Sequence, residues 1–311
     1  MPGTRITTPE DDDPVKPMMK QSIVNMVPGD TIHPDVAGGG GGKETPVSRS
    51  RGRMPVVFIG HGSPENALPG SPFGAAWKQL GEKIQKPALI LSISAHWVIQ
   101  EGTAVTATLH PRTIHDFYGF PDELYRIEYP APGSPAWAKI VQDHIHSSSI
   151  GLDYEWGLDH GTWSVLRHMY PEADIPVIQL SLNYNQPLSL LFRIGKELSP
   201  LRERGVLILG SGNLVHNLMM LSMHAKPYPW ALEFDTFVKN ALVSGTYESL
   251  IGYTQNPFAG RAHPTSEHFL PLLCVTGAAG DDRPWFFNET IFAGSVSMRC
   301  VVFGMDPVRL A

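Results

Sequence analysis

From about residue 54 onward, short apolar runs alternate with segments whose apolar residues recur every three or four positions. The first pattern predicts buried β-strands, and the second predicts helices that cover them. The predicted strands are 55–59, 89–94, 103–108, 176–182, 205–209 and 295–303, and the predicted helices are 72–84, 134–147, 163–170, 188–202, 230–244, 248–253 and 266–277. This alternation predicts an α/β fold: a single domain with a mainly parallel central sheet flanked by helices.

Residues 1–53 show neither pattern. They contain an acidic run at 10–13, five consecutive glycines at 38–42 and scattered prolines, and they lack the apolar core of a signal peptide. A segment of this composition buries too little apolar surface to offset the entropy that it would lose on ordering. We therefore expect a disordered N-terminal extension over residues 1–53 and a folded domain over residues 54–311.

The composition fits a globular protein and narrows its partners. The chain has 311 residues, of which 42% are hydrophobic and 17% charged, with a formal net charge of −6. The negative charge, and the lack of a basic run in the folded part, argue against nucleic-acid binding. No apolar stretch is long enough to span a bilayer, and the two cysteines do not suggest a disulfide framework. These features predict a cytoplasmic protein, a monomer or small homo-oligomer, with no nucleic-acid or membrane partner.

Histidine is the unusual residue, with thirteen copies against two cysteines. A metal site in this chain would therefore use imidazole and carboxylate ligands, a set that suits Fe(II), Zn, Mn, Ni or Cu. His61 and His96 each follow a predicted strand, so both should emerge at the carboxyl edge of the sheet, where ligands bind in open α/β folds. We expect the two imidazoles to face one crevice and to hold a metal ion. The alternative is that each simply caps a turn.

Two further segments offer ligands to the same edge. His216 follows a third predicted strand through a Gly-Ser-Gly-Asn turn, and it could bind the metal or carry protons. One of His263, Glu267 and His268 could complete the ligand set. A carboxylate would give the two-histidine, one-carboxylate set of non-haem iron oxygenases, whereas a histidine would give a histidine-rich site. Spacing alone leaves this choice open.

His160 and His115 are the remaining candidates for chemistry. Asp159 precedes His160 and could either orient a neighbouring imidazole or cap the helix that follows. His115 lies in a long loop rich in aromatic residues and prolines, which suits a wall against which a planar substrate binds. The alternative for His115 is a loop that packs on itself.

Several segments together carry a family resemblance. They are GHGSPENAL (60–68), SAHW (94–97), RTIHDFYGFP (112–121), WGLDHGTWSVLRHMYP (156–171), VIQLSLN (177–183), ILGSGNLVHNL (208–218) and AHPTSEHFLPLL (262–273). The chain resembles the class III, LigB-type extradiol ring-cleavage dioxygenases, and within them the 4,5-DOPA dioxygenase extradiol-like subgroup. The resemblance covers essentially residues 54–304 and makes the folded domain a catalytic one.

The resemblance implies one non-haem divalent metal, Fe(II) or Zn, at the carboxyl ends of the strands of an α/β fold. It implies that His61, His96 and His268 are ligands, with His216 as a fourth ligand or as the acid–base residue. It also implies that His160 is catalytic, as a histidine outside the ligand set that helps to bind oxygen or substrate.

The implied reaction is the opening of a catechol ring beside its two hydroxyls. The partners are then O2 and a small aromatic diol, with DOPA cleaved at the 4,5 bond as the candidate, and His115 is expected to contact the substrate. Two alternatives keep the same histidines. One is a zinc hydrolase in which bound water is the nucleophile, and the other is a non-catalytic binding protein of the same fold.

Overall fold

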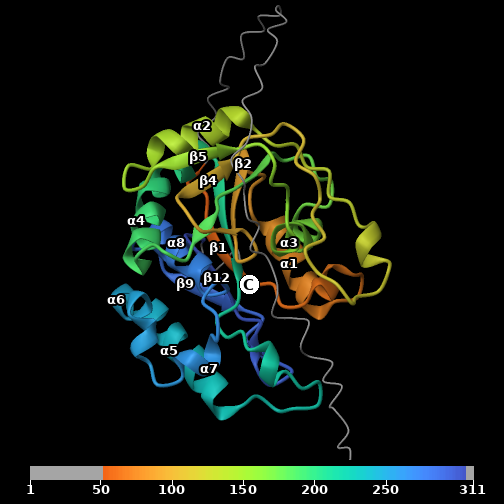
Figure 1. Ribbon diagram of the computed structural model, residues 1–311, viewed down its shortest axis with the longest axis vertical. Coiled ribbons are helices and arrows are strands. Elements are labelled where there is room, and N and C mark those ends of the chain that lie inside the picture. The colour runs from red at the N-terminus through yellow and green to blue at the C-terminus, as the bar shows by residue number, and fades with distance from the viewer. Residues whose placement is uncertain (1–51, 306–311) are drawn as a thin grey trace, which may run out of the picture. The chain divides into compact units, whose positions relative to one another are not determined.

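Figure 1 shows the computed structural model, which describes residues 52–305. The predicted N-terminal extension therefore lies almost entirely outside the described residues. The described residues belong to one compact unit built around a central sheet. Among them, no helix combines the length and the apolarity needed to cross a membrane.

The central sheet has six strands. In order across the sheet they are Val177–Gln179 (β6), Leu89–Ser94 (β2), Val206–Gly212 (β8), Val56–Gly60 (β1), Cys300–Phe303 (β12) and Pro284–Phe287 (β9). The first four run parallel, and β12 and β9 are added antiparallel at one edge. The mainly parallel sheet is therefore confirmed, with an antiparallel edge that the apolar runs alone do not reveal.

Each face of the sheet has its own apolar core, because successive side chains of a strand point to opposite faces. In β1, Phe58 belongs to one core and its neighbour Ile59 to the other, and both are fully buried. Two helices cover each face (Figure 1): Leu188–Leu198 (α4) and Leu270–Ala279 (α8) on one, Pro72–Lys83 (α1) and His160–Met169 (α3) on the other. Burial on both faces explains why these strands are continuous apolar runs in the sequence.

The remaining strands and helices surround this core. Two small parallel pairs, β4–β5 and β3–β7, and one antiparallel pair, β10–β11, lie outside the main sheet. The bounds are Val98–Ile99 (β3), Thr103–Thr106 (β4), Ile150–Asp153 (β5), Leu182–Asn183 (β7), Ile291–Phe292 (β10), Val296–Ser297 (β11), Pro135–His144 (α2), Pro229–Ser244 (α5), Tyr247–Ile251 (α6) and Ala259–Ala262 (α7).

Two predicted strands are interrupted in the structure. The segment 176–182 forms β6 and β7 separately, because Leu180 leaves the central sheet to pair with Val105. The segment 295–303 likewise splits into β11 and β12. β11 pairs with β10, whereas β12 pairs with β1, so the two halves of this apolar run belong to different sheets.

The two largest differences between predicted and observed helix ends, four residues each, both lie at a proline. The helix predicted over 188–202 ends at Leu198 and continues as a 3-10 segment that contains Pro200, which has no N–H for an α-helical hydrogen bond. The helix predicted over 266–277 begins only at Leu270, with Pro271 in its first turn. His268 therefore lies in the turn before α8.

α4 and α8 approach each other so closely that only glycine fits at two positions. A Cβ atom at Gly195 would lie 2.0 Å from the carbonyl oxygen of Cys274, and one at Gly277 would lie 2.0 Å from that of Phe192. Each glycine lowers intrinsic helix stability by about 1 kcal/mol relative to alanine. The close packing of the two helices against the sheet has to outweigh that cost.

We expect Gly277→Ala to lower the free energy of unfolding by about 1–3 kcal/mol, because the added methyl group would push the two helix backbones apart. Chemical denaturation measures the effect. Gly260→Ala on α7 is the matched control, since a Cβ there would meet no atom within 4 Å. If the two variants were equally stable, the helix contact would be looser than described.

Candidate active site

His61 and His96 leave the sheet at adjacent points of its carboxyl edge. They follow β1 and β2, and β8 lies between those two strands. The backbone N–H of His61 donates to the carbonyl of Gly212 (3.1 Å), and that of Ala95 donates to the carbonyl of Ser211 (2.9 Å). The end of β8 therefore fixes where both histidines emerge.

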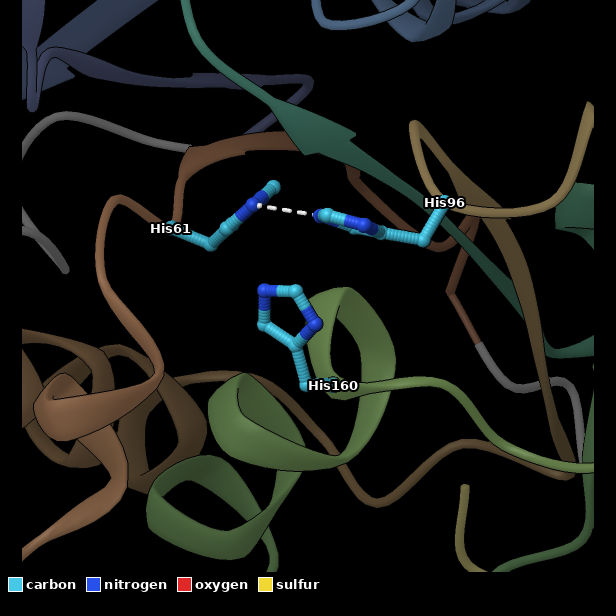
Figure 2. Close-up of side chains that lie close together, drawn as sticks. All are labelled: His61, His96 and His160. Carbon is cyan, nitrogen blue, oxygen red and sulfur yellow. Dashed lines mark hydrogen bonds between the residues drawn. The ribbon is translucent and has the colours of Figure 1, made fainter. Parts of the chain in front are cut away.

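Three imidazoles form a nearly equilateral triangle. The ring centroids of His61 and His96 lie 5.1 Å apart, and the centroid of His268 lies 5.3 Å from the first and 5.2 Å from the second. The Nε2 atoms of His61 and His96 point toward each other and are 3.1 Å apart, as the dashed line in Figure 2 shows. The structure thus brings together two histidines that follow strands and one from the turn before α8.

His160 joins this group from the first turn of α3. Figure 2 shows its ring rising from the helix toward His61 and His96. Its centroid lies 3.9 Å from that of His96 and 5.5 Å from that of His61. One ring nitrogen of each of these three histidines lies within 4.8 Å of the other two, so His160 is within reach of whatever His61 and His96 bind.

Hydrogen bonds at Nδ1 set the protonation of two of the rings. The hydroxyl of Ser211 donates to the carbonyl of Gly161, so its oxygen accepts the Nδ1–H of His61 at 3.0 Å. The carboxylate of Glu267 can only accept, and its Oε1 takes the Nδ1–H of His268 at 3.1 Å. In both rings Nε2 is then left with a free lone pair.

One carboxylate serves the other two rings. Asp116 Oδ2 lies 3.1 Å from Nδ1 of His96 and 3.0 Å from Nδ1 of His160, while Oδ1 accepts the backbone N–H of His160 at 2.9 Å. These contacts at Oδ2 are close charge contacts, and neither Oδ2 nor Nδ1 of His160 makes a hydrogen bond of good geometry. Asp116 therefore lies on the Nδ1 side of both rings, which favours a proton at each Nδ1.

Burial and neighbouring charges decide which groups are ionised. Burial, together with the adjacent histidines, holds the pKa of His61 well below its usual value. Burial also lowers the pKa of His160 and of His268. For His96 the nearby Asp116 outweighs burial and raises the pKa. The pKa of Asp116 stays well below its usual range, because His160 and His96 outweigh its own burial.

These side chains fit a divalent metal ion. The Nε2 atoms of His61 and His96 form a hydrogen bond of 3.1 Å, and with Nδ1 protonated in both rings a divalent ion could take the place of the proton between them. Two imidazole nitrogens bound to one ion at about 2.1 Å, roughly 90–110° apart, are about 3.0–3.4 Å from each other. Imidazole ligands suit both zinc and Fe(II).

His216 and the glycine-rich turn before it support His268. The ring of His216 stacks on that of His268, with centroids 3.5 Å apart and planes 10° apart. A Cβ atom at Gly212 would lie 2.1 Å from the carbonyl oxygen of His268, and the backbone N–H of Asn213 donates to that same oxygen at 2.9 Å. The turn therefore lets the segment that carries His268 pack directly on the end of β8.

Asp159 caps a helix and does not orient a site imidazole. Its Oδ1 accepts the backbone N–H of Thr162 at 3.1 Å, which makes it the N-cap of α3, and it also accepts the hydroxyl of Ser94 at 2.7 Å. The orienting role that the sequence offered to Asp159 belongs to Asp116.

His115 lies one aromatic ring away from the cluster. Its Nε2–H donates to the carbonyl of Ile127 at 2.9 Å, and its ring packs 5.7 Å from Trp163 and 5.8 Å from Phe117. Phe117 in turn contacts the ring of His160 edge-on, at 5.6 Å. His115 thus builds the loop that walls the cluster, and its contact with substrate stays a prediction.

His263 lies apart from the cluster, in the core. Its Nε2–H donates to the carbonyl of Leu214 at 2.9 Å. Three aromatic rings pack around it, those of Phe234, Tyr253 and Phe269. Of the three residues that spacing left open, His268 faces the cluster, Glu267 holds His268, and His263 does neither.

Sequence reasoning missed Asp116 and Ser211 as partners of the site histidines. Ser211 lies in a glycine-rich turn, and that composition suggested only close backbone approach. Asp116 follows His115 directly, and its position in an aromatic loop gave no sign that it reaches His96 and His160. A signal in the sequence that could have found Asp116 is that a carboxylate directly follows a histidine. That pattern identifies an acceptor, but it does not show which imidazole the acceptor contacts.

We expect His263 to make folding sensitive to acid. Burial lowers the pKa of His263 to about 4, against about 6.5 in an unfolded chain. Between these values the unfolded chain binds a proton that the folded chain does not, so the unfolding free energy falls as pH falls, by about 2 kcal/mol from pH 7.5 to pH 5. Urea unfolding with a chelator present should show a loss that is larger in the wild type than in His263→Gln by this amount, because the other buried histidines with a lowered pKa contribute equally to both proteins. Equal pH dependence in both would rule out His263 as the titrating group.

Comparison with known proteins agrees with this site. A family model described as the catalytic LigB subunit of aromatic ring-opening dioxygenase matches residues 61–300. A protein of Escherichia coli strain K12 named 4,5-DOPA dioxygenase extradiol is 44% identical over 265 residues, which cover 83% of this chain and 97% of the relative. A protein of the same name from Beta vulgaris is 42% identical over 242 residues, or 73% of this chain and 87% of the relative.

A solved structure shows the same fold. The crystal structure of an uncharacterised protein from Escherichia coli K12 matches with a TM-score of 0.71 and 39% sequence identity, over 81% of this chain and 100% of that one. The family match spans all of the histidines discussed here, and the relatives align over most of their own length. The chain therefore belongs to the LigB family and is an extradiol aromatic ring-opening dioxygenase.

Proposed function

We propose that this enzyme opens the ring of a catechol beside its two hydroxyls, at one divalent metal bound by His61, His96 and His268, with His216 as a fourth ligand. The observation that carries the proposal is the triangle of imidazoles whose Nδ1 atoms are held by acceptors, which leaves the Nε2 atoms of all three free. Neutral imidazoles with a second-sphere acceptor are the usual form of histidine ligands.

A bound metal and the residues of the chain would make different contributions to ring opening. A bound Fe(II) would supply open coordination positions at which the two catechol oxygens and O2 are brought together. The residues of the chain hold the ligands in place and exclude water, since His61 is 1% exposed and His268 5% exposed. The aromatic loop with His115 and Phe117 would form the wall beside the ring of the substrate.

His160 is proposed to move the proton. Its Nε2 is free, and burial lowers its pKa, so the ring is neutral near pH 7 and can accept a proton from a catechol hydroxyl. The imidazolium formed would be stabilised by Asp116, 3.0 Å from Nδ1. A neighbouring carboxylate in a buried site favours the charged form of the ring, so Asp116 helps His160 to take the proton without itself contacting the substrate.

The relatives that carry the name 4,5-DOPA dioxygenase extradiol suggest the substrate. DOPA, cleaved between carbons 4 and 5, is therefore the first catechol to test, with simpler catechols beside it. Both atoms of O2 would enter the ring-opened product, a semialdehyde.

The test is anaerobic loading of metal-free protein with Fe(II) or Zn, followed by O2 uptake across a panel of catechols. We expect the Fe(II) protein to consume one O2 for each ring opened and to form a yellow product. A zinc hydrolase using the same histidines would consume no O2 with any catechol and would hydrolyse an ester when loaded with zinc. Binding of catechols without turnover under either metal would favour a non-catalytic protein.

Variants separate ligands from the proton carrier. His61→Ala and His96→Ala should lose both bound metal and activity, as measured by elemental analysis and O2 uptake. His160→Ala should keep its metal and lose about 10²–10⁴ in rate, the usual contribution of a general acid–base group. His110→Ala, at an exposed histidine, is the control. Loss of metal from the His160 variant would instead make His160 a ligand.

A further inference from the structure

The segment that follows β7, residues 183–187, is fixed by asparagine side chains. The side-chain amide of Asn183 donates to the carbonyl of Gly102 at 2.6 Å, and that of Asn185 donates to the carbonyl of Gln100 at 2.8 Å. The backbone N–H of Asn185 also donates to Oδ1 of Asn183 at 2.7 Å. The loop is therefore held in one shape although it lies at the surface.

Tyr184 lies between these two asparagines and reaches toward the site. Its side chain is 51% exposed, yet its hydroxyl donates to Oε2 of Glu267 at 3.0 Å. The Glu267 side chain is only 16% exposed. A hydrogen bond to a largely buried carboxylate is roughly twice as strong as one between neutral groups.

Glu267 is also hydrogen-bonded to His268. Its Oε1 accepts the Nδ1–H of His268 at 3.1 Å and the hydroxyl of Thr265 at 2.8 Å. These partners outweigh burial and hold the pKa of Glu267 below its usual range, so the carboxylate stays ionised. Burial and the same carboxylate raise the pKa of Tyr184 above its usual value, so the phenol remains a donor. Tyr184 and His268 therefore both donate to one acceptor.

We infer that Tyr184 is a positioning residue for His268: acting through Glu267, it ties the 183–187 loop to the metal-binding cluster. The inference rests on the proposed metal site. With Thr265 and His268 on one oxygen and Tyr184 on the other, the plane of the Glu267 carboxylate is fixed from both sides. Without the phenol hydroxyl, Oε2 turns to solvent and the carboxylate can rotate, which releases the ring of His268 from its orientation.

The position matters because the proposed ligands are all neutral imidazoles. The carboxylates of Asp116 at His96 and of Glu267 at His268 then supply negative charge next to the ligand set. Outer partners of this kind typically change metal affinity by 10–100-fold when they are removed. Tyr184 orients one of these two carboxylates, that of Glu267.

The test compares Tyr184→Phe, Glu267→Gln and the double variant, starting from the metal-free full chain. Zn affinity is measured by competition with a coloured chelator, and the visible absorption bands of the Co(II)-loaded protein report on ligand geometry. We expect Tyr184→Phe to weaken Zn binding by roughly threefold to tenfold, the effect of one hydrogen bond, and Glu267→Gln by about 10–100-fold. Both changes should shift the Co(II) bands.

The double variant tests whether Tyr184 acts through Glu267. In the Glu267→Gln background, Tyr184→Phe should change Zn affinity by less than about twofold, because the acceptor charge is already lost. An equal effect of Tyr184→Phe in both backgrounds would overturn the route through Glu267. Wild-type Zn affinity and unshifted Co(II) bands in Tyr184→Phe would overturn the role of Tyr184 altogether.

A matched control excludes a general effect of losing a phenol hydroxyl. Tyr247 on α6 donates to the carbonyl of Gly280 at 3.2 Å, away from the histidines, so Tyr247→Phe should leave Zn affinity and the Co(II) bands unchanged. Binding of Zn and Co(II) by the wild type distinguishes failure of the proposed metal site from failure of the proposed role of Tyr184. If it bound neither Zn nor Co(II), the proposed metal site would fail as well; if it bound both and Tyr184→Phe matched it, only the role of Tyr184 would fail.

Discussion

The need to satisfy buried imidazole nitrogens shapes this molecule more than any other interaction. An unpaired polar atom in a protein interior costs about 1–3 kcal/mol, and four histidines meet here in one place. Ser211 and Glu267 accept hydrogen bonds at the Nδ1 atoms of His61 and His268, and the Asp116 carboxylate lies close to the Nδ1 atoms of His96 and His160. The ends of β1, β2 and β8, the first turn of α3 and the turn before α8 meet around these imidazoles. What the protein leaves unpaired is the site where a cation fits.

The sequence predicts the sheet and its edge well, because strands buried on both faces are continuous apolar runs. β2 has the predicted bounds, and the convergence of His61 and His96 follows from parallel strands alone. The antiparallel edge and the split strands could not be predicted, since the partner of an apolar run depends on segments far away in the chain. For the same reason the role of Asp116 was not predicted: its two contacts cross from a loop to a strand end and to a helix.

The choice between Glu267 and His268 shows a limit of reasoning from spacing. Both are ligand types, and they are adjacent in sequence. The structure separates them by direction: His268 turns its ring toward His61 and His96, while Glu267 turns to the far side of that ring and accepts its Nδ1–H. A carboxylate next to a histidine can therefore hold that histidine instead of facing the site itself, and a pattern of residue types cannot distinguish these two roles.

The place of β8 between β1 and β2 has a consequence for how the protein is made. β8 is synthesised after both of its neighbours, yet it separates them in the sheet and receives the backbone N–H groups that fix His61 and Ala95. A growing chain that has left the ribosome only as far as β2 carries His61 and His96 without the strand that aligns them. The histidine cluster is thus assembled late in synthesis, and an incomplete chain cannot present its imidazoles in the geometry of the finished enzyme.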